Sequence, residues 1–400
     1  MFHGFMHDSK QRTVIKMKNH SKILCVVLAL VIALTAASCS LSKQYAYQKD
    51  DIELPIGSYI LYLQQAYSQA QSYAQQSELY DSEKGTYDGK KSFLKMEITD
   101  DDNNTAVAED WIINKAQELT KTAIAGMYKA KELGCTLDEA EFANTETQIK
   151  TYWDQGYSDQ YEPYGIGMDS LIALTKANTL SDEAFKAQYS ADGPTPVSDE
   201  DLAEYFTENY TSYKYFSANL YETVTEASED GSSEDTSTDV PLSEDKIAEY
   251  QKDFDSYAST LSSGGSFDDV LKKYMDKYEI EEDPHTENVA ILDEDSTDEV
   301  MSAIKDLKDG QAMTIMVGDT DESKQIYLIY REPIDDQVEA YTKTATGDEA
   351  ETTQSNRDSV LSSMKSDEFE QLIKDSIETL GITLTSACNS FKPSMFEQTK

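Results

Sequence analysis

Apolar residues recur at steps of three and four along the first half of the chain. The clearest run is 112–133, in which the apolar positions are Ile112, Ala116, Leu119, Ala123, Met127, Ala130 and Leu133. This spacing forms one stripe along an α-helix, and Gly134 follows it as a C-cap. Further helices are predicted over 59–80, from Thr136 with a Thr-x-x-Glu capping box, over 168–191, and over 198–210 with Ser198 as N-cap. The first half is therefore predicted to be helical.

The pattern changes at residue 213, where the aromatic stretch "YKYFSANLY" is typical of a strand. Two amphipathic helices follow, one capped by Ser243 and ended by Gly264 and Gly265, the other capped by Ser266. Next come a strand over 288–292, a helix containing Val300, Ile304 and Leu307, and strands over 312–317 and 325–331. The order β-α-α-β-α-β-β over about 120 residues is that of one small α+β domain.

Other segments lack a buried face. Residues 40–58 resemble a tether and 81–108 a loop, whereas 223–240, rich in Ser, Thr, Asp and Glu, is predicted to be disordered. A last amphipathic helix has no neighbour in sequence, so we expect it to return to the helical domain. The predicted division is 1–38 signal peptide, 39–58 tether, 59–212 helical domain, 213–334 α+β domain, 335–354 acidic linker and 355–400 returning C-terminal helix.

The N-terminal segment determines the expected compartment. Residues 17–40 contain two lysines, an apolar run from Ile23 to Ala37 and small residues that end at Cys39, which is typical of a secretory signal. The tail "AASC" resembles a bacterial lipobox, with Ala36 in place of the usual Leu, and Met17 is the natural start. A transmembrane anchor is disfavoured because no stop-transfer pattern follows. We expect lipidation of Cys39 and an extracytoplasmic protein anchored to the cell membrane of a bacterium of the Gram-positive type.

Charge excludes several kinds of partner. The chain has 76 acidic and 34 basic residues, a formal net charge of −42, so nucleic acid and anionic lipid head groups would be repelled. The 26 tyrosines offer rings that can be buried while the hydroxyl stays hydrated. Cys135 and Cys388 could pair, but two cysteines do not make a disulfide framework, and we favour buried thiols.

Catalytic and metal chemistry have little support. His285 is the one histidine left after the signal, and neither a nucleophile elbow nor a cluster of zinc ligands accompanies it. The acidic run 293–299 lacks the spacing of an EF-hand loop. The Gly-Gly-Ser turn at 264–266 follows a helix and precedes Asp268 and Asp269, so it is a poor phosphate loop. We expect neither a cofactor nor a metal.

Several stretches, in order, resemble a known family. "TLSSGGSFDDVLKKYM" (260–275) resembles a signature of parvulin-type peptidyl-prolyl isomerase domains, and 215–221, 303–317 and 325–334 resemble their neighbouring segments. "VSDEDLAEYFTENY" (197–210) is similar to the linker helix of SurA/PrsA-type secreted foldases. The resemblance implies a mostly helical, discontinuous chaperone domain, like the SurA N-terminal domain, and a small parvulin-like α+β domain. It implies a membrane-anchored extracytoplasmic chaperone that binds unfolded secreted polypeptides.

The resemblance also implies where the active site should be. Active parvulins resemble one another in a pair of histidines on the first and last strands, and the matching positions here are Asn219 and Tyr327. Because neither is histidine, we expect a weak or inactive isomerase. Phe267, Met313 and Tyr327 are the implied peptide-binding residues. Two alternatives stay open: an active isomerase that uses Asn219 and Tyr327, and a surface lipoprotein that binds a ligand.

Overall fold

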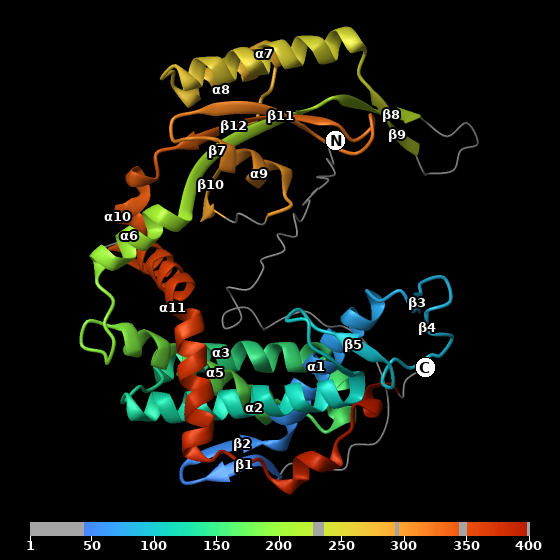
Figure 1. The fold of residues 1–400 in the computed structure, drawn as a ribbon, viewed down its shortest axis with the longest axis vertical. Helices are drawn as coiled ribbons and strands as arrows, with labels where there is room; N and C mark the ends of the chain where they lie inside the picture. Colours follow the sequence, from blue (N-terminus) through green and yellow to red (C-terminus); the bar gives the residue numbers. More distant parts are fainter. Residues whose placement is uncertain (1–43, 227–235, 293–295, 344–349, 398–400) are drawn as a thin grey trace, which may run out of the picture. The chain divides into compact units, whose positions relative to one another are not determined.

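The computed structural model describes residues 44–226, 236–292, 296–343 and 350–397. They form a mixture of helices and small antiparallel sheets, which agrees with the predicted α+β class. The described residues form two compact units (Figure 1). The helical unit consists of 44–197 and 365–397, and the sheet unit of 198–364.

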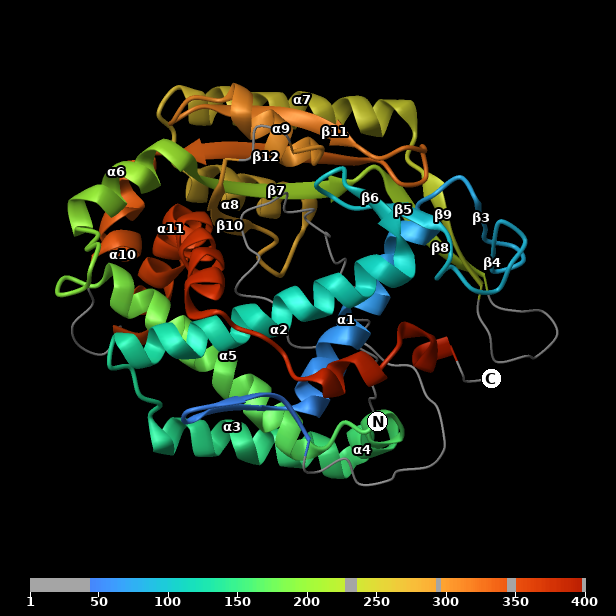
Figure 2. The ribbon, with the colours of Figure 1, turned by 60° about the horizontal axis from the view of Figure 1, so that its bottom comes forward.

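Small side chains allow three long helices of the helical unit to pack closely (Figure 2). The helices are α1 (Ile56–Gln75), α2 (Ala108–Glu132) and α5 (Met168–Tyr189). A Cβ added at Gly57 of α1 would lie 2.2 Å from Oγ of Ser170 on α5. At Gly126 of α2, it would lie 2.6 Å from Oγ of Ser181. Larger side chains at either glycine would separate these helices. The predicted helices over 112–133 and 168–191 are confirmed within a few residues.

Shorter elements complete the helical unit. They are β1 (Tyr45–Lys49), β2 (Ile52–Pro55), β3 (Tyr80–Asp81), β4 (Thr86–Tyr87), β5 (Glu97–Thr99), β6 (Thr105–Val107), α3 (Glu139–Tyr152), η1 (Trp153–Tyr157), α4 (Ser158–Tyr161), η2 (Glu162–Tyr164), η4 (Ser386–Ser390) and η5 (Pro393–Glu397). The helix predicted from Thr136 begins at Glu139 instead, because Asp138 Oδ1 accepts the N–H of Ala140. Cys135 and Cys388 are free thiols, and burial raises the pKa of each.

The predicted tether differs from the structure at residues 45–55. These residues form the β1–β2 hairpin, in which Ala46 and Leu54 are fully buried. Ala46 O also accepts the N–H of Thr385, a residue near the other end of the chain. The hairpin is therefore part of the core, whereas the signal peptide, with Cys39, lies outside the described residues.

The sheet unit begins with α6 (Asp199–Asn209), where Ser198 and Asp201 form the capping box of the helix. Its strands are β7 (Tyr210–Asn219), β10 (Thr286–Ile291), β11 (Ala312–Val317) and β12 (Gln325–Glu332), arranged antiparallel in the order β10-β7-β12-β11. Helices α7 (Glu244–Ser262) and α8 (Phe267–Tyr278) cover one face, and α9 (Glu299–Asp306) covers the other (Figure 1). These elements follow one another in the order predicted from the sequence.

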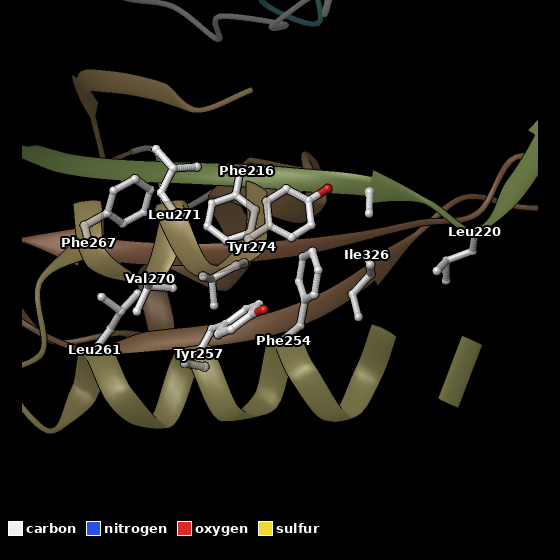
Figure 3. Packing of buried hydrophobic residues seen from close by; sticks show 13 residues of the cluster. Phe216, Leu220, Phe254, Tyr257, Leu261, Phe267, Val270, Leu271, Tyr274 and Ile326 are labelled. Atoms are coloured by element: carbon white, nitrogen blue, oxygen red, sulfur yellow. The ribbon is translucent and has the colours of Figure 1, made fainter. Parts of the chain in front are cut away.

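Buried side chains, many of them aromatic, form the core between the sheet and α7 and α8 (Figure 3). Phe216 is fully buried. The centroid of its ring lies 5.5 Å from the ring centroid of Phe254 and 4.5 Å from that of Tyr274. The turn between the two helices is the predicted one: Gly264 has a φ of 89°, and Ser266 Oγ accepts the N–H of Asp269. The Gly-Gly-Ser segment is thus a structural connection.

Three further segments predicted to lack structure have some. In the predicted loop 81–108, β5 and β6 pair as a hairpin, and β4 pairs with β3. Residues 223–240 were predicted to be disordered, but β8 (Tyr221–Glu226) and β9 (Thr236–Pro241) pair as a hairpin, because the Thr and Val residues there favour extended backbone. Residues 227–235 lie outside the described residues. The predicted linker 335–354 begins within η3 (Ile334–Gln337), contains α10 (Val338–Thr342) and ends within α11 (Ala350–Leu380). Tyr341 of α10 stacks on Phe206 at 5.1 Å, which explains the order of this segment.

Candidate functional site

The face of the sheet next to α9 holds the residues of most chemical interest. Strand alternation puts Tyr213, Tyr215, Ser217 and Asn219 of β7 on this face, together with Tyr327 of β12. We call this surface the α9 face. The opposite face holds Phe216 and Leu328, which pack against α7 and α8.

The strand register decides which residues meet on the α9 face. Tyr327 lies directly opposite Ser217, and Asn219 lies opposite Gln325. The Tyr327 hydroxyl donates a hydrogen bond of 2.7 Å to Gln325 Oε1, and Gln325 Nε2 donates one of 2.8 Å to Asn219 Oδ1. Gln325 therefore links the two positions that were predicted from the sequence, although they are not direct cross-strand partners.

Tyr213 and Tyr327 of this face stay neutral at ordinary pH. Burial raises the pKa of Tyr327, nearby Tyr215 raises it further, and a hydrogen bond with Ser217 partly opposes the shift. Burial raises the pKa of Tyr213 as well, and nearby Tyr215 adds to the shift. A neutral phenol can donate and accept hydrogen bonds but does not exchange protons near pH 7. The α9 face is therefore suited to hydrogen bonding, not to acid–base chemistry.

Apolar and aromatic groups surround these hydrogen bonds. The rings of Tyr215 and Tyr327 lie 5.8 Å apart, and Met313 is partly buried in the same cluster. Ile315 and Met301 are also partly buried there. Tyrosine and methionine are adaptable contact residues, so an extended peptide would find both apolar contacts and hydrogen-bonding partners here.

Phe267 does not join this site. It begins α8 on the opposite face of the sheet, is only 7% exposed, and contacts the rings of Phe216 and Tyr330. His285 also lies next to Phe267, with ring centroids 5.9 Å apart, and its Nδ1 is 2.6 Å from Oδ1 of Asp283. The structure therefore brings Met313 and Tyr327 to one face and Phe267 to the other, which makes Phe267 a core residue.

Surface grooves, including the following two, occur in the described part of the helical unit. The first, about 660 Å³, lies between α2 and the end of α11, and its lining includes Tyr128, Leu372 and Leu380. Lys129 and Glu132 also line this groove and form an ion pair of 3.1 Å. The second, about 510 Å³, lies between α3 and α5 and includes Phe142. Both could accept apolar side chains of a polypeptide.

Metal binding and membrane insertion have no structural support in the part of the chain described. His, Cys, Asp and Glu side chains form no group of three or more there that could hold a metal ion. No described helix combines the length and the apolar character needed to cross a bilayer. Residues 293–295 of the acidic run lie outside the described residues.

Sequence reasoning missed Ser217 and Gln325. Neither residue type carries a functional signal, and both gain interest only because the register places them beside Tyr327 and Asn219. The period-2 alternation of β12 could have identified Gln325 as a neighbour of Tyr327 on the same face. The pairing of β12 with β7 could not be read from either strand alone.

Comparisons with known proteins give little further information. No protein-family model and no curated protein matches this sequence. Among solved structures, the foldase protein PrsA from Streptococcus pneumoniae str. Canada MDR_19A is similar over 76% of this chain and 100% of that chain. The identity is 14% and the TM-score is 0.29, values that do not establish a common fold.

Proposed function

We propose that this protein is an extracytoplasmic chaperone of the SurA/PrsA type that binds unfolded secreted polypeptides. One observation carries the proposal: the α9 face combines partly exposed tyrosine and methionine side chains with neutral hydrogen-bonding groups at Tyr327, Gln325 and Asn219. Such a surface binds extended peptide reversibly. Apart from the β8–β9 hairpin inserted after β7, the order β7-α7-α8-β10-α9-β11-β12 further supports a parvulin-like origin of the sheet unit.

We propose that isomerase activity is weak or absent. Rotation about a peptide bond must overcome a barrier of about 18–20 kcal/mol. The chain has no histidine after residue 20 except His285, which contacts Phe267 on the face opposite Tyr327. The site thus lacks the histidine pair that the parvulin resemblance leads us to expect.

The chaperone proposal is tested by aggregation of denatured clients. Several unrelated proteins are diluted from denaturant with an equimolar amount of the full chain without its signal, and light scattering is recorded. Suppression for most clients is expected, and suppression for none would refute the proposal. A Met313→Ala, Tyr327→Ala double variant should suppress less than a Val224→Ala control, because Val224 is 43% exposed on the separate β8–β9 hairpin.

An active isomerase is the first alternative, and the Tyr327–Gln325–Asn219 hydrogen bonds favour it, because such groups can contact a prolyl amide. A refolding assay distinguishes an active isomerase from a chaperone without isomerase activity, if the substrate protein's refolding rate is limited by proline isomerisation. Acceleration by substoichiometric protein, abolished by Tyr327→Phe, would establish catalysis. No acceleration is expected.

A ligand-binding lipoprotein is the second alternative. The groove of about 660 Å³ lies within the range of about 300–1,000 Å³ that small-molecule sites occupy. This alternative requires saturable binding of one solute without suppression of aggregation.

We further propose that Cys39 carries a lipid that anchors the protein to the outer side of the cell membrane. Radiolabelled palmitate should enter the wild-type chain, and Cys39→Ala should release the protein into the medium. Equal membrane retention of the variant would exclude this anchor.

A further inference from the structure

A surface group of aromatic rings lies in the helical unit. It consists of Tyr152, Trp153, Tyr157 and Tyr161, at the end of α3, in η1 and in α4, and we call it the aromatic cluster. Trp153 and Tyr161 are nearly parallel, at 8°, with centroids 6.4 Å apart. Tyr152 stacks on Tyr157 at 5.7 Å, and Tyr157 meets Tyr161 edge-on at 5.9 Å.

The backbone is shaped to produce this arrangement. Two helical segments meet at a kink within Trp153–Tyr157, where Gly156 has non-helical backbone angles: its φ is 124°, a conformation that residues with a Cβ rarely adopt. In a regular α-helix, residues 153 and 161 would be two turns apart, about 12 Å along the axis. The irregular turn is therefore what brings Trp153 and Tyr161 together.

The cluster is not a hydrophobic core. None of its rings is buried, and Tyr152 is 42% exposed. Four large rings held together at the surface differ from the tyrosines of the sheet core, such as Tyr274, which is 3% exposed. The exposed ring surface is available to a partner.

The charge around the rings indicates what kind of partner. Residues 152–164 contain Asp154, Asp159 and Glu162 but neither lysine nor arginine. Lys150 forms an ion pair of 3.0 Å with Asp154. In the described part of the chain, the cation–π contacts involve Tyr278 and Tyr189, and none involves a ring of the aromatic cluster. Ring faces and carboxylates both attract cations, so the local charge is complementary to a basic ligand.

We propose that the aromatic cluster binds arginine and lysine side chains of extended polypeptide segments. An arginine guanidinium would stack on Trp153 or Tyr161, since a planar, weakly hydrated cation suits an aromatic face, while Asp159 and Glu162 supply the compensating charge. This inference rests on the proposed chaperone function, for which it names the client class: unfolded segments that carry basic residues.

The test uses Trp153 as its own reporter. The chain has two tryptophans, and Trp111→Phe leaves Trp153 as the only one. A 12-residue peptide of alternating Ser and Arg is titrated while tryptophan fluorescence is recorded. Saturable quenching is expected, with affinity at least tenfold higher than for the same peptide with Gln in place of Arg, and lower affinity at high salt because exposed charges are screened.

Variants of the cluster identify the binding residues. Tyr157→Leu and Tyr161→Leu should each lower affinity for the Arg peptide about three- to tenfold, a range that cation–π energies support. The control is Tyr80→Leu, which removes one ring of another aromatic pair, Tyr80 and Tyr87, whose ring centroids lie 5.0 Å apart. Asp159→Asn should lower affinity less and reduce its salt dependence. Circular dichroism checks that each variant is folded.

The outcomes separate the inference from the proposed function. Equal affinity for the Gln and Arg peptides, or binding of a neutral oligosaccharide in place of both, would overturn the inference. If the protein suppresses aggregation and the cluster variants suppress it equally well, for basic and acidic clients alike, the inference fails while the chaperone function stands. If the Arg peptide binds but no client is protected, the basic-segment site stands and the chaperone function fails.

Discussion

Replacing Phe267 by alanine should destabilise the sheet unit by about 3 kcal/mol. The side chain is 7% exposed and lies 5.9 Å from Phe216, 6.2 Å from Tyr330 and 5.9 Å from His285, measured between ring centroids. Buried Phe→Ala substitutions cost about 3–5 kcal/mol, part of which depends on how far the neighbours collapse into the cavity. Phe267 begins a helix after a loop, so some collapse is expected, and the lower end of the range applies. The midpoint of thermal unfolding should fall by about 6–12 °C, the shift expected for a unit of this size.

The assay must report on the sheet unit itself. Both tryptophans, Trp111 and Trp153, lie in the helical unit, so tryptophan fluorescence does not follow the sheet. Hydrogen exchange of the β7 and β12 amides, read by mass spectrometry, gives the free energy of opening directly. Val224→Ala is the control, because a side chain that is 43% exposed should change this free energy by less than about 0.5 kcal/mol.

If Phe267→Ala lowers the free energy of opening of the sheet unit by less than about 1 kcal/mol, Phe267 is not a core residue. A loss of peptide affinity at unchanged stability would contradict the assignment of Phe267 to the core more strongly, because it would return Phe267 to the peptide-binding role implied by the family resemblance. The expected result is loss of stability, with peptide affinity unchanged in the folded fraction.

Three further predictions concern stability. Burial raises the pKa of Asp182 from 3.8 to about 6, so between these values the folded protein binds more protons than the unfolded chain, and stability falls as pH rises through this window. Asp182→Asn should flatten this part of the pH–stability curve and stabilise the protein at pH 7 by about 1 kcal/mol. This is less than the free energy that corresponds to the whole pKa shift, because solvent screens the carboxylate. If urea titrations give the same pH–stability curve for the variant and the wild type, this reasoning is wrong. Ser198→Ala removes the side-chain acceptor for the N–H of Asp201 and should cost about 1 kcal/mol, whereas Ser198→Thr should cost far less, as calorimetry can measure. Gly264→Ala should cost about 1 kcal/mol because φ is 89° there, and a smaller loss for Gly264→Asn, which tolerates this conformation better, would support backbone strain as the cause.

Local signals account for the elements that were predicted well. Ser243 and Ser266 cap α7 and α8 as expected, and β11 spans the predicted 312–317. Caps and periodicity depend on residues within one or two turns, so they can be read from sequence. The β1–β2 hairpin was missed because its order comes from packing and from a bond to Thr385, hundreds of residues away.

The candidate site was predictable only in part. The sequence alone indicated that Tyr327 and Met313 lie on strands and that no histidine stands near Asn219 or Tyr327. It could not indicate that Gln325 connects Tyr327 to Asn219, because that link needs the register between β12 and β7. A shift of one residue in that register would have turned a different set of side chains to the α9 face.

The sequence by itself determined the helix caps at Ser198, Ser243 and Ser266, the acidic composition of the chain and the absence of a catalytic histidine pair, since each depends on residue identity and short-range spacing. Only the tertiary structure decided that Phe267 and Tyr327 lie on opposite faces of one sheet, that Ser217 faces Tyr327, and that a kink at Gly156 brings Trp153 beside Tyr161. These relations depend on how strands pair and where a helix departs from its regular form. Both follow from the packing of the folded chain and not from any short stretch of it.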